Sequence, residues 1–337
     1  MRASLGQAVL AGLVEGLGAL SVAESPESVR ALDLLEMDPA LLELRLDEPM
    51  ARHTTLRLGG PADVWARPAN IPTLAALLAR CEASKTPVHF VGSGTNLLVR
   101  DGGLRGVVIN LGRINEVSRP DPEGQPTRVH VEAGASTGRL LSKATAWELG
   151  GVEFLGGVPG SVGGGLIMNA GTYLGEFTNV VTKVRSLDLS GRERLRDHAA
   201  CGFRYRDSDL PKHEIVVWAE LELRPRPRAE IDAEVAALRK RRDEREPKKV
   251  PNNGSTFKNP TGDHAGRLIE AAGLKGTRRG GAIVSPKHAN WLVVDRSIDP
   301  ACTAADMLEL IEFVRAEVER VHGVRLETEV KVIGEPG

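Results

Sequence analysis

Two glycine-rich segments constrain the fold more than any other feature of this 337-residue sequence. Gly156–Gly165 holds six glycines in ten residues, and Gly92–Asn96 has two more beside Thr95 and Asn96. Glycine at this density argues against the interior of an ordinary helix or strand, and favours backbone that approaches another group closely. We therefore expect both segments to be loops.

Loops of this kind can bind a phosphate through backbone N–H groups, because glycine allows positive φ and leaves no Cβ in the way. Thr95, Asn96 and Ser161 add side-chain donors. Neither segment matches the dinucleotide fingerprint G-x-G-x-x-G or the Walker A motif with its Lys-Ser/Thr. A structural turn explains either loop alone, whereas two such loops in one region favour a large diphosphate ligand.

Composition excludes several classes of protein. The 44 basic and 45 acidic residues give a formal charge of -1, so no bulk field favours nucleic acid or an anionic membrane. The cysteines Cys81, Cys201 and Cys302 show no C-x-x-C spacing, which indicates reduced thiols rather than a disulfide framework or a metal site. No apolar run reaches the ~18 residues of a membrane span, and Met1–Val22 lacks the features of a secretory signal. We expect a cytoplasmic protein without a metal ion.

The pattern of apolar residues predicts a mixed order of helices and strands. Residues 1–48, rich in Leu, Ala and Glu, look helical. Further helices are expected at 70–81, 137–147, 231–238, 264–272 and 303–323, and strands at 88–91, 107–111, 129–133, 215–223, 282–284, 291–294 and 326–332. This order lacks the regular alternation of a doubly wound sheet, so the expected fold class is α+β.

Three polar segments could carry chemistry. Tyr205–Ser208 follows an aromatic residue, Asn253–Pro260 is a polar loop, and Leu326–Lys331 places Glu327 and Glu329 on one face of the expected last strand. Each also has a simple structural interpretation, namely a surface ion-paired turn, an ordinary turn and a solvated strand. The residue chemistry alone does not join the three segments into one site.

Taken together, the motifs resemble the UDP-N-acetylenolpyruvoylglucosamine reductase family, the flavoenzymes that make UDP-N-acetylmuramate. The motifs occur in family order: His53–Gly60, Gly92–Asn96, Gly156–Gly165, Met168–Gly171, Tyr205–Ser208, Gly254–Pro260, Ser285–Asn290 and Glu329–Gly334. The resemblance covers residues 50–334. Arg206 and Ser255 are 49 positions apart, which is similar to the shorter branch of the family that lacks an inserted tyrosine-bearing loop.

The resemblance implies a two-part FAD-binding region like that of the vanillyl-alcohol-oxidase flavoproteins, plus a smaller α+β substrate-binding domain. The implied division is an extension at 1–48, a first FAD subdomain at 49–112 joined by the terminal strand 325–334, a second FAD subdomain at 113–224 and the substrate domain at 225–324. It further implies non-covalent FAD, NADPH as co-substrate, a UDP-sugar substrate and a monomer. The implied reaction reduces UDP-N-acetylglucosamine enolpyruvate in peptidoglycan precursor synthesis.

The resemblance also assigns site residues. The implied cofactor-binding residues are Arg57, Gly92, Ser93, Gly94, Thr95, Asn96, Gly157, Gly160, Ser161, Gly164, Asn169 and Gly171. The implied substrate-binding residues are Tyr205, Arg245, Lys258, Asn259, Lys275 and His288, with Asn96 as a further contact. Among catalytic residues, Ser255 would donate a proton to an enolate that Arg206 and Glu329 stabilise, roles that agree with a fixed guanidinium fork and preorganised donors.

Two positions depart from the family pattern. Many members have a lysine near a proline that holds the phosphates of the nicotinamide nucleotide. This chain has Arg245-Glu246-Pro247-Lys248 there, so Arg245 is the positional match and Lys248 is an alternative. His288 stands where other members can have an uncharged amide.

Two other functions share some of these features. A flavin oxidase acting on a sugar would have the glycine loops, and so would a nucleotide-binding protein without catalytic activity. Neither needs Arg206, Ser255 and Glu329 as they are placed in this sequence.

Overall fold

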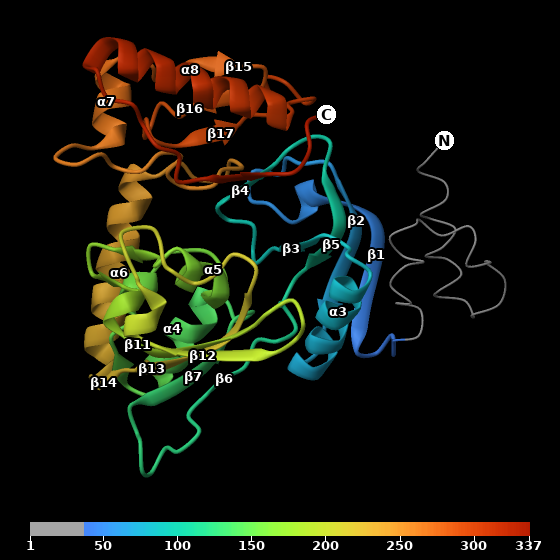
Figure 1. The fold of residues 1–337 in the computed structure, drawn as a ribbon. Coiled ribbons are helices and arrows are strands. Elements are labelled where there is room, and N and C mark those ends of the chain that lie inside the picture. Colours follow the sequence, from blue (N-terminus) through green and yellow to red (C-terminus); the bar gives the residue numbers. More distant parts are fainter. Residues whose placement is uncertain (1–36) are drawn as a thin grey trace. The chain divides into compact units, whose positions relative to one another are not determined.

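The computed structural model describes residues 37–337, which form two compact units (Figure 1). The first unit comprises the described residues up to Glu48 together with Ala62–Gly92 and Arg105–Ala236. The second comprises Pro49–Pro61, Ser93–Leu104 and Ala237–Gly337. Residues of the expected first FAD subdomain therefore occur in both units, and the four-part domain division stays a prediction.

The first unit contains a four-stranded sheet with one helix beside it. The strand order is β1 (Leu42–Pro49), β2 (Pro61–Pro68), β5 (Leu104–Ile109) and β3 (Val88–Phe90), with β3 parallel to β5. The helix α3 (Ile71–Ala83) begins after Asn70, whose side chain accepts a hydrogen bond from the Thr73 N–H at 2.9 Å. Its fully buried Leu74, Leu77 and Leu78 join the core of this unit, as the sequence pattern predicts.

The prediction of a helical segment over residues 1–48 is wrong where the structure describes it. Residues 1–36 lie outside the described part, whereas Leu42–Pro49 forms the strand β1. Leu42, Leu44 and Leu46 alternate with charged residues, and Leu42 and Leu46 are buried. This period of two is the pattern of a strand with one buried face, and it outweighs the helix propensity of Leu and Glu.

A second, five-stranded antiparallel sheet completes the first unit. Its order is β12 (Glu193–Asp197), β11 (Val181–Leu187), β13 (Ile215–Glu222), β7 (Arg128–Glu132) and β6 (Val117–Ser118). The helices α4 (Thr137–Ala146) and α5 (Val162–Ile167) and two short strand pairs, β8 (Leu149–Gly150) with β14 (Arg224–Pro225) and β9 (Gly171–Thr172) with β10 (Gly175–Glu176), accompany it. The amphipathic helix α6 (Arg228–Arg245) forms as predicted, and the boundary between the units falls within it.

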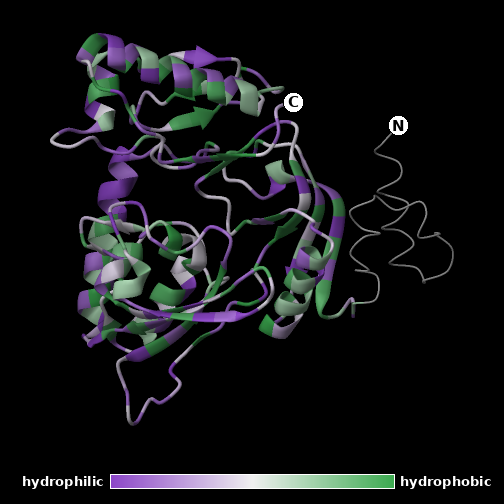
Figure 2. Cartoon of the chain, viewed as in Figure 1, coloured by the Kyte–Doolittle hydropathy of each residue, from purple (hydrophilic) through white to green (hydrophobic). Residues whose placement is uncertain are grey.

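The second unit contains a small antiparallel sheet and two helices. The sheet order is β15 (Arg278–Arg279), β16 (Ala282–Val284) and β17 (Leu292–Val294), and the helices are α7 (Ala265–Ala271) and α8 (Ala304–His322). As expected, Thr303 and Asp306 form a capping box at the start of α8, and Gly323 ends the helix with a φ of 67°. Figure 2 shows apolar and polar residues alternating along α8, a polar β15 and an apolar β17.

The chain ends beside the first glycine loop. The strand β18 (Lys331–Ile333) pairs in parallel with β4 (Leu97–Val99) in the second unit. The expectation of a regular strand over 326–332 is wrong, because only Lys331–Ile333 is a strand. Thr328 instead forms an isolated bridge with Phe257, so Glu327 and Glu329 do not lie on one face of a regular strand.

Helices and strands of both units give the mixed α+β class that the sequence predicts. In the part of the chain that the structure describes, none of the helices combines the length and the apolar character required to span a bilayer.

Candidate active site

The first glycine loop offers a run of free backbone donors. The N–H groups of Gly92–Thr95 have no hydrogen-bond partner among the described residues, whereas the Gly92 carbonyl accepts from Asn110 Nδ2 at 2.9 Å. Gly94 has a φ of 63°, and a Cβ on it would lie 1.9 Å from the His53 carbonyl oxygen. Only glycine fits there, and successive unpaired N–H groups are the donors that a phosphate requires.

The second glycine-rich segment is not entirely a loop, which corrects the sequence-based expectation. Gly163, Gly164 and Gly165 lie in the helix α5. A Cβ on Gly163 would lie 2.9 Å from Ala133 Cβ, and one on Gly165 would lie 2.5 Å from the Phe177 ring. These two glycines therefore serve close packing of a short helix against the core, at the cost in helix propensity that glycine carries.

The part of this segment that precedes α5 keeps the properties of a phosphate-binding loop. The N–H groups of Gly157, Gly160 and Ser161 have no partner among the described residues, and the two glycines have φ values of 84° and 140°. A Cβ on Gly92 would lie 2.3 Å from Ser161 Oγ, so the two glycine segments touch within the first unit. The N–H of Gly164 is directed at Ser161 Oγ at 3.4 Å. The open N–H groups of Gly157, Gly160 and Ser161 are donors of the kind that a phosphate requires.

Arg206 lies on a tight turn of the first unit. Arg204 and Asp207 exchange two backbone hydrogen bonds of 2.9 and 3.1 Å, and Arg206 between them has a left-handed φ of 55°. The Arg206 guanidinium donates to the Gly171 carbonyl at 3.1 Å and lies 5.1 Å from the ring centroid of the exposed Tyr205. The turn therefore presents Tyr205 and Arg206 together, and their contacts with substrate stay predictions.

The Asn169 side chain forms a hydrogen bond with the backbone of this turn. Its side chain is fully buried, donates to the Arg204 carbonyl at 3.1 Å and accepts from the Thr178 N–H at 2.9 Å. Together with the Gly171 carbonyl, it ties the turn to the short hairpin β9–β10. The protein itself uses the Asn169 side chain in this way, and the cofactor contacts of Asn169 and Gly171 stay predictions.

Ser255 and Glu329 come together in the second unit. The Glu329 N–H donates to the Thr256 carbonyl at 2.8 Å, and the Lys258 N–H donates to the Glu327 carbonyl at 2.8 Å. The loop that carries Ser255 therefore runs beside the segment that carries Glu329, although 74 positions separate the two residues in the sequence. The half-buried Ser255 hydroxyl has no hydrogen-bond partner among the described residues, which leaves it available to a ligand.

Asn290 is a structural residue of this site that the motif search did not single out. It is buried, accepts from the Phe257 N–H at 2.9 Å and donates to the Phe257 carbonyl at 2.8 Å. Its own carbonyl accepts from the Thr256 N–H at 2.8 Å. Asn290 ends the motif Ser285–Asn290. The sequence of this motif does not show that the Asn290 side chain forms both hydrogen bonds with the backbone of Phe257, 33 positions away.

We expect Asn290→Leu to lower the free energy of unfolding by about 2–4 kcal/mol, because it leaves a buried N–H and a buried carbonyl of Phe257 unpaired. Urea unfolding measures the change. Asn252→Ala is the matched control, since Asn252 makes local contacts in the same loop and should cost under about 1 kcal/mol. Equal costs for the two variants would contradict the role given to Asn290.

His288 lies within electrostatic range of Lys275, Arg245 and Glu270 in the second unit. The half-buried His288 accepts from the Asn290 N–H through Nδ1 at 3.3 Å, which leaves Nε2 to donate. Burial lowers the pKa of His288, and the positive charges of Lys275 and Arg245 lower it further. Lys275 also forms a 2.7 Å ion pair with Glu270. Three predicted substrate-binding residues, Lys275, Arg245 and His288, therefore interact electrostatically in the second unit.

The remaining predicted residues of the second unit have local partners. Lys258 lies 3.7 Å from a Glu327 carboxylate oxygen, and Asn259 Oδ1 accepts from the first N–H of α7 at 3.1 Å. Arg57, with a φ of 56°, accepts on its carbonyl from the Arg296 guanidinium at 2.9 Å. Their ligand contacts stay predictions.

We expect His288→Gln to weaken the dependence of stability on acid pH. The folded-state pKa of His288 is lowered, so the unfolded chain binds more protons as pH falls below about 6.5 and the folded state loses stability. Glutamine removes that contribution while keeping an amide donor. Urea unfolding at pH 7.5 and 5.5 checks this, with His264→Gln as the control for loss of a histidine. An unchanged pH dependence in His288→Gln would contradict the assignment.

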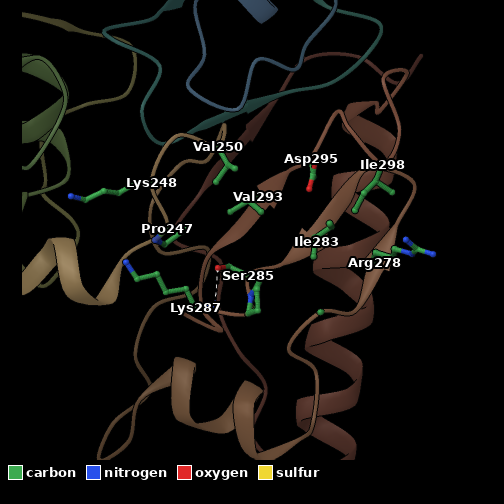
Figure 3. Close-up of a pocket in the computed structure, with 12 residues that line it drawn as sticks. Pro247, Lys248, Val250, Arg278, Ile283, Ser285, Lys287, Val293, Asp295 and Ile298 are labelled. Atoms are coloured by element: carbon green, nitrogen blue, oxygen red, sulfur yellow. Dashed lines mark hydrogen bonds between the residues drawn. The ribbon is translucent and has the colours of Figure 1, made fainter.

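A cavity of about 560 Å³ in the second unit is lined by Gly276 and Lys287, the sequence neighbours of Lys275 and His288 (Figure 3). The cross-strand neighbours Ile283 and Val293 line it. Lys248 also lines it and pairs with Asp243 at 2.7 Å, and in Figure 3 its side chain extends away from the centre of the cavity. Lys248 thus lines this cavity, and the choice between Arg245 and Lys248 as the match to the family's lysine stays a prediction.

Comparisons with known proteins agree with this geometry. Residues 62–194 match the family model described as an FAD binding domain, and residues 246–333 match the one described as UDP-N-acetylenolpyruvoylglucosamine reductase, C-terminal domain. The solved structure of UDP-N-acetylenolpyruvylglucosamine reductase from Thermus caldophilus is 34% identical and superposes with a TM-score of 0.72, covering 86% of this chain and 98% of that one.

Curated relatives match over nearly their whole length. The UDP-N-acetylenolpyruvoylglucosamine reductase of Moorella thermoacetica is 43% identical over 294 residues, which is 87% of this chain and 94% of the relative. The protein of the same name from Alkalilimnicola ehrlichii is 45% identical over 293 residues, 87% of this chain and 95% of the relative. The chain belongs to the UDP-N-acetylenolpyruvoylglucosamine reductase family.

Proposed function

We propose that this protein reduces the enolpyruvyl group of UDP-N-acetylglucosamine enolpyruvate to give UDP-N-acetylmuramate, with FAD as cofactor and NADPH as reductant, in peptidoglycan precursor synthesis. The observation that carries the proposal is the hydrogen bond from the Glu329 N–H to the Thr256 carbonyl, which places the backbone of Glu329 beside the loop of the unpaired Ser255 hydroxyl. The family membership and the open N–H groups of the glycine segments support it.

When bound, FAD would supply the hydride chemistry for reduction of the enol ether, and the open N–H groups of the glycine segments would hold its diphosphate. The residues of the chain handle the charge and the proton that follow. Ser255 donates its hydroxyl proton to the enolate carbon, which is basic enough to take it from a weak acid. Arg206 provides a permanent positive charge for the substrate carboxylate. Glu329 either carries a proton or shares one in a hydrogen bond, because two ionised carboxyl groups at close range repel each other.

Lys275 and Lys258 suit the phosphate oxygens of the uridine diphosphate, and a neutral His288 can donate from Nε2. Arg245 or Lys248 would hold the phosphates of the nicotinamide nucleotide. Three finer features belong to the same proposal: a monomer, a cytoplasmic location and membership of the shorter branch of the family. The 49 positions between Arg206 and Ser255 support the last of these.

Anaerobic flavin spectroscopy tests the proposal. NADPH should bleach the yellow protein, and the enolpyruvyl substrate should restore the colour, whereas UDP-N-acetylglucosamine without the enolpyruvyl group should not. Colour that returns only with oxygen would favour a sugar oxidase, and absence of bleaching would favour a nucleotide-binding protein. Acid denaturation should release all of the flavin, since the cofactor is held without a covalent bond.

A further inference from the structure

Asn96 contacts the segment that carries Glu329 through both its side chain and its backbone. Its amide Nδ2 donates to the Glu329 carbonyl at 3.0 Å, and its own carbonyl accepts from the Lys331 N–H at 3.0 Å. The two residues of the first contact are 233 positions apart in the sequence. The pairing of β4 with β18 continues directly from this point.

Glu329 is consequently held on both sides of its α-carbon. Its N–H is bound by the Thr256 carbonyl at 2.8 Å and its carbonyl by Asn96. The first bond comes from the loop that carries Ser255, and the second comes from the end of the first glycine loop. These two bonds fix the origin of the Glu329 side chain relative to the proton donor. A carboxyl group that acts on a reacting carbon depends on such fixation, because a displacement of about 1 Å can cost about 100-fold in rate.

We propose that Asn96 is a positioning residue for the reaction, which acts through Glu329 by holding its backbone carbonyl. The inference rests on the proposed function. It differs from a cofactor contact of the Asn96 side chain, because one of the two amide donors is committed to a protein carbonyl. A purely structural role predicts general loss of stability, whereas positioning predicts loss of one half-reaction.

Stopped-flow measurement of the two half-reactions separates these possibilities. In Asn96→Ala we expect flavin reoxidation by the enolpyruvyl substrate to slow about 10- to 100-fold, while flavin reduction by NADPH changes less than about threefold. Asn110→Ala is the matched control, since Asn110 donates its amide to the carbonyls of Val91 and Gly92 and makes no hydrogen bond to Glu329 in the described part of the chain. If the alanine variant folds poorly, Asn96→Ser replaces it, because serine is a common turn residue. The same two half-reactions are then measured.

A double-mutant cycle with Glu329→Ala decides between the two roles. If Asn96 acts through the Glu329 carboxyl, Asn96→Ala should slow reoxidation by less than about threefold in the Glu329→Ala background. A full additional 10- to 100-fold loss in that background, or equal slowing of both half-reactions, would overturn the proposal. A wild-type protein that does not react with the enolpyruvyl substrate would instead refute the proposed function, so the two failures are distinguishable.

Discussion

In Ser255→Ala, flavin reduction by NADPH should proceed at a near-normal rate, while reoxidation by the enolpyruvyl substrate slows by about two orders of magnitude or more. The reason is that Ser255 donates a proton only after hydride has reached the substrate, and positioned proton donors contribute about 10²–10⁴-fold to a rate. Its hydroxyl has no partner among the described residues, so removing it breaks no hydrogen bond of the fold. Anaerobic stopped flow measures each half-reaction separately.

Ser255→Cys is the matched variant for this test. A thiol keeps a transferable proton in a side chain of similar shape and is more acidic than a hydroxyl, so it should recover part of the activity that alanine loses. Equal slowing of both half-reactions in Ser255→Ala would show a general disturbance of the loop. A cysteine variant no faster than the alanine variant would contradict proton donation.

The sequence predicts the elements whose signals are local. The helix α8 has a capping box at Thr303 and Asp306, apolar residues at spacings of three and four, and Gly323 at its end, and the structure has the same bounds within a residue. The helix α3 likewise starts after Asn70. In both cases the residues that start and stop the helix lie next to it in the chain, so no tertiary information is needed.

Elements whose form depends on distant packing are less predictable. Gly163 and Gly165 of α5 are required because Ala133 and Phe177 occupy the space where their side chains would stand, and no local pattern shows those neighbours. The last strand is short because Thr328 bridges to Phe257 instead of continuing a regular ladder. In each case a tertiary contact overrides the propensity of the segment.

The candidate site shows the same division. Family motifs name Ser255 and Glu329, but only the fold shows that the backbone of Thr256 joins them. The structural role of Asn290 cannot be predicted from its motif, because a buried asparagine that bonds to a distant backbone has no local signature. The N–H groups of Gly92–Thr95 are partly predictable. The glycines predict backbone that a ligand can approach closely, but only the structure shows that these N–H groups have no partner among the described residues.

Glu329→Gln should retain more activity than Glu329→Asp. Glutamine keeps the length of the side chain and a hydrogen-bond donor, which replaces a carboxyl group that works in its protonated or hydrogen-bonded form. Aspartate keeps the acid but is one methylene shorter. The main chain cannot move to compensate, because Thr256 holds the Glu329 N–H at 2.8 Å and Asn96 holds its carbonyl at 3.0 Å. We expect a loss of about 10-fold for glutamine and about 100-fold for aspartate in the rate of flavin reoxidation.

Combining Glu329→Gln with Ser255→Ala tests whether the two side chains serve one step. Both lie on segments joined through Thr256, and both are proposed to act on the same enolate, one by polarising it and the other by protonating it. Groups that work as a unit give losses that are much smaller together than the product of the single losses. The double variant should therefore reoxidise flavin within about threefold of Ser255→Ala alone. A loss equal to the product of the two single effects would mean that Glu329 acts independently of proton transfer, and its carboxyl would then need a role in binding the substrate rather than in its protonation.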